Sequence, residues 1–207
     1  MSRSEVIGRI ICFTLAIILV QAASGPPARA AQPAVVGSVE ELEGQVTVTH
    51  AGSVQARPVT VGTGILLHDT VRTLPGGKVR IRFLDESRIS LASDSQVRID
   101  EYVYRPDRKE RSGAIKVLWG KVKCVVEDVT DYRHKKFDVT TDTAVIGVRG
   151  TEFLVWIKTK GQTQVAAFKK ALDVAGLVDK ARKIILDPGY LTDVALGRLP
   201  AAPIKIT

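Results

Sequence analysis

The sequence predicts an all-β protein, folded as a twisted β-solenoid-like or sandwich-like domain. Residues 31–207 contain 25 Val, 15 Thr and 11 Ile, and β-branched side chains favour strands because they pack well on a pleated surface. Apolar and polar residues alternate with a period of two in several short runs, which is typical of strands with one buried face. Turn residues separate these runs, and many short strands at this spacing indicate an all-β fold instead of βαβ units.

Residues 1–30, ahead of this domain, have the pattern of a signal peptide. Arg3 and Arg9 provide a positive start, and an apolar stretch of fourteen residues follows over 10–23. That stretch is shorter than the about 20 residues that cross a membrane. The triplet Ala28-Arg29-Ala30 then offers a small-x-small cleavage site, so we expect cleavage between Ala30 and Ala31 and a periplasmic or secreted protein. The alternative is an uncleaved N-terminal anchor.

The charge of the mature chain limits its partners. Residues 31–207 carry 27 Lys and Arg against 21 Asp and Glu, a net charge of +6. In an exported protein this balance suits an acidic partner surface or an anionic envelope component, and we expect no nucleic acid partner. No later stretch reaches the about 18 apolar residues of a membrane span, so we expect none in the mature chain. Cys124 is its only cysteine, so we expect no internal disulfide.

Alternation and turn signals place the individual strands along the chain. Arg80 and Arg82 alternate with apolar residues, and Lys121 and Lys123 do the same further along. The residues expected to face the core in these runs are Val79, Ile81, Phe83, Ile89, Leu91, Val97, Ile99, Val122 and Cys124. The turns expected between strands are Pro75-Gly76-Gly77, Asp85-Glu86, Lys160-Gly161 and Asp187-Pro188-Gly189.

Three segments are less regular. Residues 105–113 are rich in charge and predict a solvated connection. The stretch 172–186 is compatible with a short helix around Leu177–Lys183. The tail after Pro200 is expected to be extended and mobile.

An internal pattern recurs along the chain. Val39-x-x-Leu42-x-Gly44-x-Val46-x-Val48 returns as Ile115-x-x-Leu118-x-Gly120-x-Val122-x-Cys124, and again over 165–174 with Lys170 at the glycine position. The copies start 76 and 50 residues apart, which excludes a strict solenoid period. We interpret the pattern as a strand–bend–strand unit in which glycine allows the bend. Chance similarity among Val-rich strands is the alternative.

The most distinctive stretch is TDTAVIGVRGTEF, over residues 141–153. It resembles the T-x-T-A-x-I-G-V-R-G-T signature of the FecR domain family. Three shorter stretches resemble the family's L-x-G-x-V, G-D-x-V-x-T and F-x-D-G-S elements, and they are LEGQV at 42–46, LHDTVRT at 67–73 and VRIRFLDES at 79–87. The chain departs from the family pattern at His68 and Glu86, where the family usually has Gly, and at Lys169-Lys170, where it usually has Glu-Gly.

The resemblance implies a FecR-like β domain over residues 37–175, with a C-terminal extension over 176–207 that holds a short strand or helix and the mobile tail. It implies a place in the bacterial envelope, where the namesake regulators receive a signal from an outer-membrane transporter and pass it to a cytoplasmic sigma factor. The sequence places only a signal peptide ahead of the domain, so we do not expect the anti-sigma role. We expect an exported binding module for an envelope protein, acting in protein interaction or signal reception.

The family motif supplies the candidate site residues, and these are Asp69, Thr73, Gly147, Arg149, Gly150 and Thr151. We interpret them as structural positions. Arg149 is expected to meet a carboxylate such as Asp69, Asp85 or Asp94, or carbonyl groups at strand ends, because a guanidinium satisfies several buried acceptors at once. The functional alternative makes Arg149 an anchor for an acidic partner.

Nothing in the sequence points to catalysis, a cofactor or a metal. Asp94, Asp100 and Glu101 lack a partner nucleophile, and the three histidines lack the spacing of metal ligands. We therefore expect a non-enzymatic protein. The aromatic residues Tyr102, Tyr104, Trp119, Phe153 and Trp156 are expected in the core, and a sugar-stacking platform is the alternative. A second hypothesis is accordingly an envelope structural module, or one that binds glycan or lipopolysaccharide through its aromatics and its basic segments 105–111 and 133–136.

Overall fold

The computed structural model describes residues 34–206. The predicted signal peptide and its cleavage site lie outside the described residues. Seventeen strands and one short 3-10 helix, Pro106–Arg108, make up the described chain, which confirms the all-β prediction. Between residues 34 and 206, no helix has the length and apolar character needed to cross a membrane.

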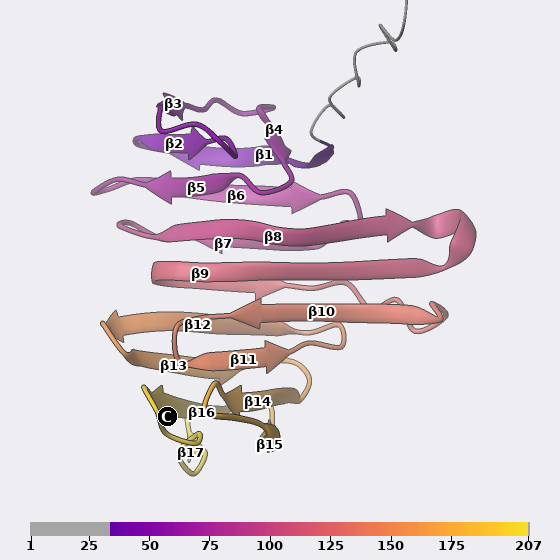
Figure 1. Ribbon diagram of the computed structural model, residues 1–207, viewed down its shortest axis with the longest axis vertical. Helices are drawn as coiled ribbons and strands as arrows, with labels where there is room; N and C mark the ends of the chain where they lie inside the picture. The colour runs from indigo at the N-terminus through magenta and orange to yellow at the C-terminus, as the bar shows by residue number, and fades with distance from the viewer. Residues whose placement is uncertain (1–33, 207) are drawn as a thin grey trace, which may run out of the picture. The chain divides into compact units, whose positions relative to one another are not determined.

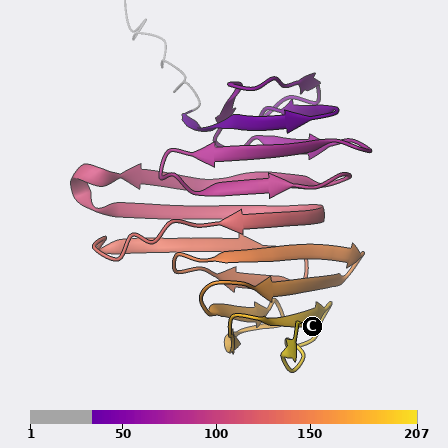
Figure 2. The same cartoon turned by 180° about the vertical axis from the view of Figure 1, so that it is seen from behind.

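The strands form two layers that share β9 (Figures 1 and 2). Their pairing is antiparallel except between β9 and β10, which run parallel. In order of pairing, the first sheet contains β4 (Gly64–Leu66), β1 (Val35–Glu43), β6 (Lys78–Phe83), β7 (Arg88–Leu91), the second part of β9 (Glu110–Val125), β12 (Glu152–Thr159), β13 (Gln162–Ala167), β16 (Tyr190–Ala195) and β17 (Ile204–Lys205). The second sheet contains β3 (Ala56–Pro58), β2 (Val46–Thr49), β5 (Thr70–Thr73), β8 (Gln96–Arg105), the first part of β9, β10 (His134–Thr140), β11 (Ala144–Gly147), β14 (Leu172–Gly176) and β15 (Asp179–Leu186).

The core lies between the two layers. All nine residues predicted to face it are buried, and they belong to one hydrophobic cluster to which both sheets contribute. Ile81 from the first sheet and Ile99 from the second are fully covered. The period-two pattern therefore identified the inner face of each of these strands correctly.

The recurring pattern marks the places where the chain passes from one layer to the other. β1 of the first sheet leads into β2 of the second, β9 changes sheets within its own length, and β13 of the first sheet leads into β14 of the second. Gly44 and Gly120 lie at the first two corners with φ of 67° and 83°. The interpretation as a strand–bend–strand unit is confirmed.

The structure corrects two of the local predictions. Residues 172–186 form the hairpin of β14 and β15, so the helix around Leu177–Lys183 is wrong. Pairing along this hairpin supplies the backbone hydrogen bonds, and Leu172, Val174 and Leu186 are buried as a strand pattern requires. The predicted extension over 176–207 forms β15, β16 and β17, which continue both sheets, and the tail after Pro200 is extended at β17.

The charged segment 105–113 is also more ordered than predicted. Only a tight turn around η1 separates β8 from β9, and the strand pairing already begins at Arg105 and Glu110. Arg111 pairs with Tyr104 and its side chain is buried, so the prediction of a solvated loop is wrong for residues 110–113.

His68 and Glu86 have φ of 69° and 67°, so both non-glycine departures from the family pattern adopt the left-handed conformation that glycine favours. We expect Glu86→Gly to raise the free energy of unfolding by about 0.5–1 kcal/mol, because the strain of a side chain there exceeds the entropy that glycine loses. Urea unfolding measures the change. Glu86→Ala is the matched control, since it also removes the exposed ion pair with Arg82 but keeps the strain. Equal stability of the Gly and Ala variants would contradict the prediction.

Candidate functional site

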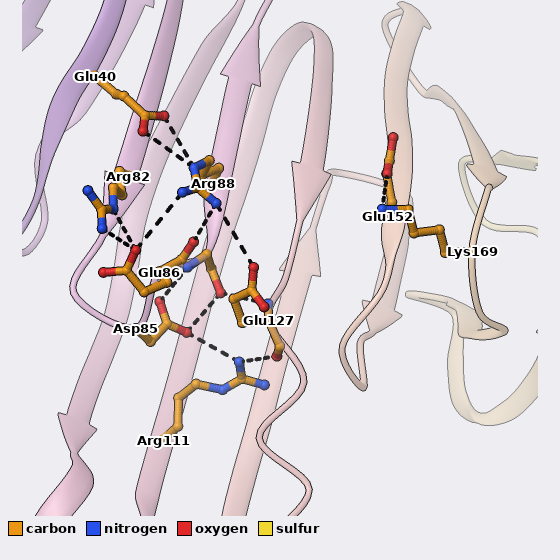
Figure 3. A network of polar contacts seen from close by, with 10 residues as sticks. Glu40, Arg82, Asp85, Glu86, Arg88, Arg111, Glu127, Glu152 and Lys169 are labelled. Carbon is orange, nitrogen blue, oxygen red and sulfur yellow. Dashed lines mark hydrogen bonds and ion pairs between the residues drawn. The ribbon is translucent and has the colours of Figure 1, made fainter.

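A buried ion pair links the turn after β6 to the start of β9. Arg111 Nη1 lies 3.2 Å from Asp85 Oδ2, and the two side chains are 1% and 0% exposed. Tyr102 Oη donates to Asp85 Oδ1 at 2.9 Å, and Ser87 Oγ donates to Asp85 Oδ2 at 2.9 Å. Burial, together with the negative charge of Asp85, raises the pKa of Tyr102, so the phenol remains a donor. The carboxylate is therefore held by three side chains from three segments. Figure 3 shows the contact between Asp85 and Arg111.

The same guanidinium fixes the chain that leaves β9. Arg111 Nη1 donates to the Glu127 carbonyl at 2.7 Å, and the Glu127 N–H donates to Ser87 Oγ at 3.1 Å. The Arg111 guanidinium carbon lies 5.5 Å from the centre of the Phe137 ring on β10, within the range of a cation–π contact. The ion pair thus joins both layers at the level of β9.

Around this buried pair lies a surface network of charges. Arg88 is close to three glutamates, with Glu40 at 3.3 Å and Glu86 and Glu127 each at 4.0 Å (Figure 3). Further along the first sheet, Lys123 and Lys169 flank Glu152 at 2.7 and 3.0 Å and lower its pKa. Partly exposed pairs such as these contribute little to stability, so the buried Arg111–Asp85 pair is the structural centre of the network.

The sequence analysis missed Arg111. One signal could have found it, because Arg111 and Gly113 continue the alternation of the buried residues Ile115 and Val117 backward along β9. Asp85 was recognised as a turn residue and as a candidate partner of Arg149, but not as the partner of Arg111. The pairing itself joins residues 26 positions apart and depends on which strands become neighbours.

Arg149 lies elsewhere than expected. Its side chain is 81% exposed, and the carboxylate nearest to it is that of Asp173, at 3.9 Å. Asp69 and Asp85 instead bind His50 and Arg111. Asp173 is already paired with Lys183 at 2.6 Å, so the Arg149 guanidinium has no buried acceptor to satisfy. Asp69, Asp85 and Asp94, the three carboxylates named for Arg149, are therefore not its partners, and its structural role stays a prediction.

The other motif residues contribute to local geometry. Asp69 is fully buried and accepts from the Leu66 N–H and from His50 Nδ1, each at 2.8 Å. Thr73 donates to the Ala92 carbonyl at 2.6 Å and accepts from the Ser95 N–H. Thr151 accepts from the Lys170 N–H at 2.8 Å and donates to its carbonyl, which ties two loops together.

The two glycines of the motif, Gly147 and Gly150, differ in how much space a Cβ would have. Gly150 has φ of 71°, and a Cβ there would lie 2.6 Å from Asp128 Cα, so only glycine fits. A Cβ on Gly147 would meet Asp173 Cβ at 3.4 Å, an ordinary contact. Gly147 therefore keeps the groove beside Asp173 open instead of relieving strain.

Arg149 and Gly147 border a groove of about 550 Å³ over β10 and β11. Phe137 and Val148 supply its apolar part, and Lys135 and Lys136 lie on its border with Arg149. Three carboxylates also line it, but each is paired, namely Asp138 with Lys136, Asp173 with Lys183, and Asp128 with Lys170, which lowers the pKa of Asp128. Lys135 donates to the Thr130 carbonyl. The cations that are not closely paired with a carboxylate, Arg149 and Lys135, are placed to accept an acidic group.

A second surface lies on the outer face of the first sheet. Lys121 and Lys158 lie over the ring of Trp156 at 4.3 and 5.4 Å from its centre. The neighbouring groove, of about 500 Å³, is lined by Lys121, Lys123, Arg80 and Leu154 among others. Trp119 is 44% exposed, so the expected core position is wrong for Trp119 and Trp156, whereas Phe153 and Tyr102 are buried as predicted.

Groups that could support catalysis or metal binding remain separate from one another. Asp94 and Glu101 each accept a hydrogen bond from an exposed serine hydroxyl, of Ser93 and of Ser112, and Asp100 pairs with Arg98. Within residues 34–206, no group of three or more His, Cys, Asp or Glu is placed to hold a metal ion. The arrangement offers charged surfaces for contact with another molecule.

Cys124 lies in the core, and burial raises the pKa of its thiol to about 12. Because the thiolate is the reactive form, we expect alkylation by iodoacetamide at pH 8 only when the protein unfolds. The rate of alkylation followed by mass spectrometry should rise with urea in parallel with the unfolded fraction. Complete labelling of the native protein within minutes would contradict this.

Comparison with known proteins agrees with this architecture. Two solved structures of a candidate anti-sigma factor from Parabacteroides distasonis ATCC 8503 are similar to the chain, one with 16% identity and a TM-score of 0.51, the other with 15% and 0.50. Each similarity covers 66% of this chain and 59% of the other, so the chain spans less than two thirds of the anti-sigma structures. Identity this low shows a shared fold alone. No curated protein matched the sequence.

The motif at β11 and the start of β12 and the Asp69 turn are both within the region that a family model recognises. Residues 69–171 match the model described as FecR protein. The chain therefore carries a FecR domain and belongs to the FecR domain family.

Proposed function

We propose that the protein is an exported, non-enzymatic binding module of the bacterial cell envelope, which receives a protein partner in signal reception. One observation carries this proposal: Arg149, in the middle of the family motif, is 81% exposed and its nearest carboxylate is already paired with Lys183. A cation at a groove, in the bend between β11 and β12 and without a close partner of its own, is suited to bind an acidic group of another molecule.

Buried apolar residues lie beneath this charge. Phe137 and Val148 line the groove but are only 1% and 2% exposed, so a partner would meet the charged side chains at its border. The Arg111 pair beneath fixes Phe137 through the cation–π contact. The groove is therefore rigid before binding, which lowers the entropy cost of association.

Charge reversal at Arg149 tests the proposal. The protein is tagged at its C-terminus, expressed with its own N-terminal segment, and used to capture partners from detergent-solubilised envelope, with quantitative mass spectrometry of the retained proteins. We expect Arg149→Glu to reduce retention of one reproducible partner by about tenfold or more, since a charge-assisted hydrogen bond contributes about 1.5–3 kcal/mol. Arg57→Glu on β3, also exposed, is the matched control. Equal retention by Arg149→Glu and Arg57→Glu would contradict the proposal.

A second candidate function is binding of an anionic glycan or lipopolysaccharide at the outer face of the first sheet. The specific observation in its favour is Trp156 between two lysines, since an aromatic ring next to cations suits a sugar that carries phosphate or carboxylate groups. In the capture experiment, this function predicts retention of lipopolysaccharide without a protein partner. That retention should fall with added salt and in Trp156→Ala, while Arg149→Glu leaves it unchanged.

A further inference from the structure

The four outer edges of the two sheets differ in how far they are protected. β3 has three residues and ends in Pro58, β4 has three residues, and β17 has two. Short strands and proline prevent a further strand from pairing. β15 is different, because it has eight residues without proline, and among residues 34–206 it pairs only with β14. The pairing is regular over Lys183–Leu186, and a register shift separates this part from Asp179. The regular part of this edge is therefore longer than β3, β4 or β17.

The hydrogen-bond ladder shows which backbone groups of β15 are free to pair. The Leu177 N–H donates to the Thr143 carbonyl. Because backbone groups of successive residues point to opposite sides of a strand, every second residue of β14 counted back from Leu177 directs its N–H and C=O toward β11. Leu172 and Val174 consequently direct their backbone groups toward β15, where they face Leu186 and Ile184. The N–H and C=O groups of Lys183 and Ile185 point away from the sheet, toward the position of an added strand.

The side chains of this edge select against a second copy of the chain. β15 carries Lys180, Arg182 and Lys183, and each of them is exposed. If two β15 strands paired antiparallel over their full length, Arg182 of one would lie opposite Lys183 of the other. Like charges directly opposite are destabilising. The same cations attract a strand of opposite charge.

Apolar side chains accompany the cations. Ile185 is 65% exposed, and Leu177 and Val178, at the turn into β15, are 40% and 59% exposed. Lys183 and Ile185 share one face of β15, whereas Lys180 and Arg182 lie in the irregular part of the strand, beyond the register shift. A strand that carries both carboxylates and apolar side chains would match these cations and Ile185.

We propose that the edge of β15 binds an acidic, extended segment of a protein partner as an added strand of the second sheet. The backbone groups of Lys183 and Ile185 supply the ladder, Lys180 and Arg182 select acidic side chains, and Ile185 contacts the apolar ones. This inference rests on the proposed function, because it names a second contact of the same binding module. It uses a different surface from the groove at Arg149.

The test uses the purified protein and a fluorescein-labelled octapeptide of alternating Glu and Val, with alternating Lys and Val as the charge-reversed probe. Fluorescence anisotropy measures binding, and amide hydrogen exchange locates it. We expect the Glu peptide to bind at least about tenfold more tightly than the Lys peptide and to slow exchange at Lys183 and Ile185. Ile185→Pro should abolish binding, because proline removes an outward N–H that β14 does not use. Ile185→Thr, which keeps that N–H, should still bind.

A second variant covers the case in which Ile185→Pro does not fold. Lys180→Glu/Arg182→Glu changes only exposed side chains and should reverse the preference toward the Lys peptide. Equal affinity for both peptides, or a preference unchanged in this double variant, would overturn the inference. Arg149→Glu should leave peptide binding intact. A negative result in the partner capture at the Arg149 groove can therefore be told apart from a negative result in peptide binding at β15.

Discussion

Replacing Arg111 by Met is expected to lower the free energy of unfolding by about 3–5 kcal/mol, because it leaves the Asp85 carboxylate buried without its cation. Asp85 is fully buried, and its remaining partners, Tyr102 and Ser87, are neutral hydroxyls. The Glu127 carbonyl and the face of Phe137 lose a contact in the same substitution. Urea unfolding followed by circular dichroism measures the change.

Two further variants separate charge from packing in this experiment. Adding Asp85→Asn to Arg111→Met removes the uncompensated charge and should recover about 1–3 kcal/mol of the loss. Arg82→Met, which breaks an exposed pair with Glu86, should cost less than about 1 kcal/mol. If Arg111→Met cost no more than Arg82→Met, the buried pair would not be a structural centre of the domain.

Gly120→Ala is expected to destabilise the protein by about 2–5 kcal/mol, from backbone strain and overpacking together. Gly120 has φ of 83°, and a Cβ there would lie 2.4 Å from Ser95 Oγ and 2.5 Å from the Asp94 carbonyl oxygen. The substitution acts at the corner where β9 leaves the second sheet and enters the first. Thermal unfolding and urea unfolding should both show the loss.

The matched control is Gly76→Ala. Gly76 has a similar φ of 76°, but a Cβ there would meet no atom within 4 Å. This variant should therefore cost only the strain of the left-handed conformation, about 1–2 kcal/mol. Equal losses in the two variants would show that the corner at Gly120 can relax and that close packing against Ser95 is not required.

The local pattern of the sequence was enough to predict much of the fold. Alternation placed Ile81, Ile99 and Val122 on the inner faces, and the recurring glycine pattern located the corners at Gly44 and Gly120. These predictions succeeded because a strand's inward face and a positive φ are properties of a few consecutive residues. The FecR motif succeeded for the same reason, since it is one continuous stretch.

The candidate site was less predictable. Arg149 was expected to meet one of three named carboxylates, whereas its side chain is exposed and the carboxylate nearest to it is that of Asp173. Residues 110–113 of the expected loop, and the helix expected around Leu177–Lys183, are strand because β8, β10 and β14 supply pairing partners there. Charge and composition of these segments do not reveal the strands that pair with them.

The sequence by itself thus determined the all-β class, the inward residues and the family of this protein. The tertiary structure alone decided that Arg111 is buried against Asp85, that Arg149 is exposed at a groove, and that β15 is an open edge. The physical reason is that a charged side chain can be buried only where strand pairing brings it an equally buried counter-charge, and an edge is open only where no other strand pairs. Both conditions depend on contacts between distant parts of the chain.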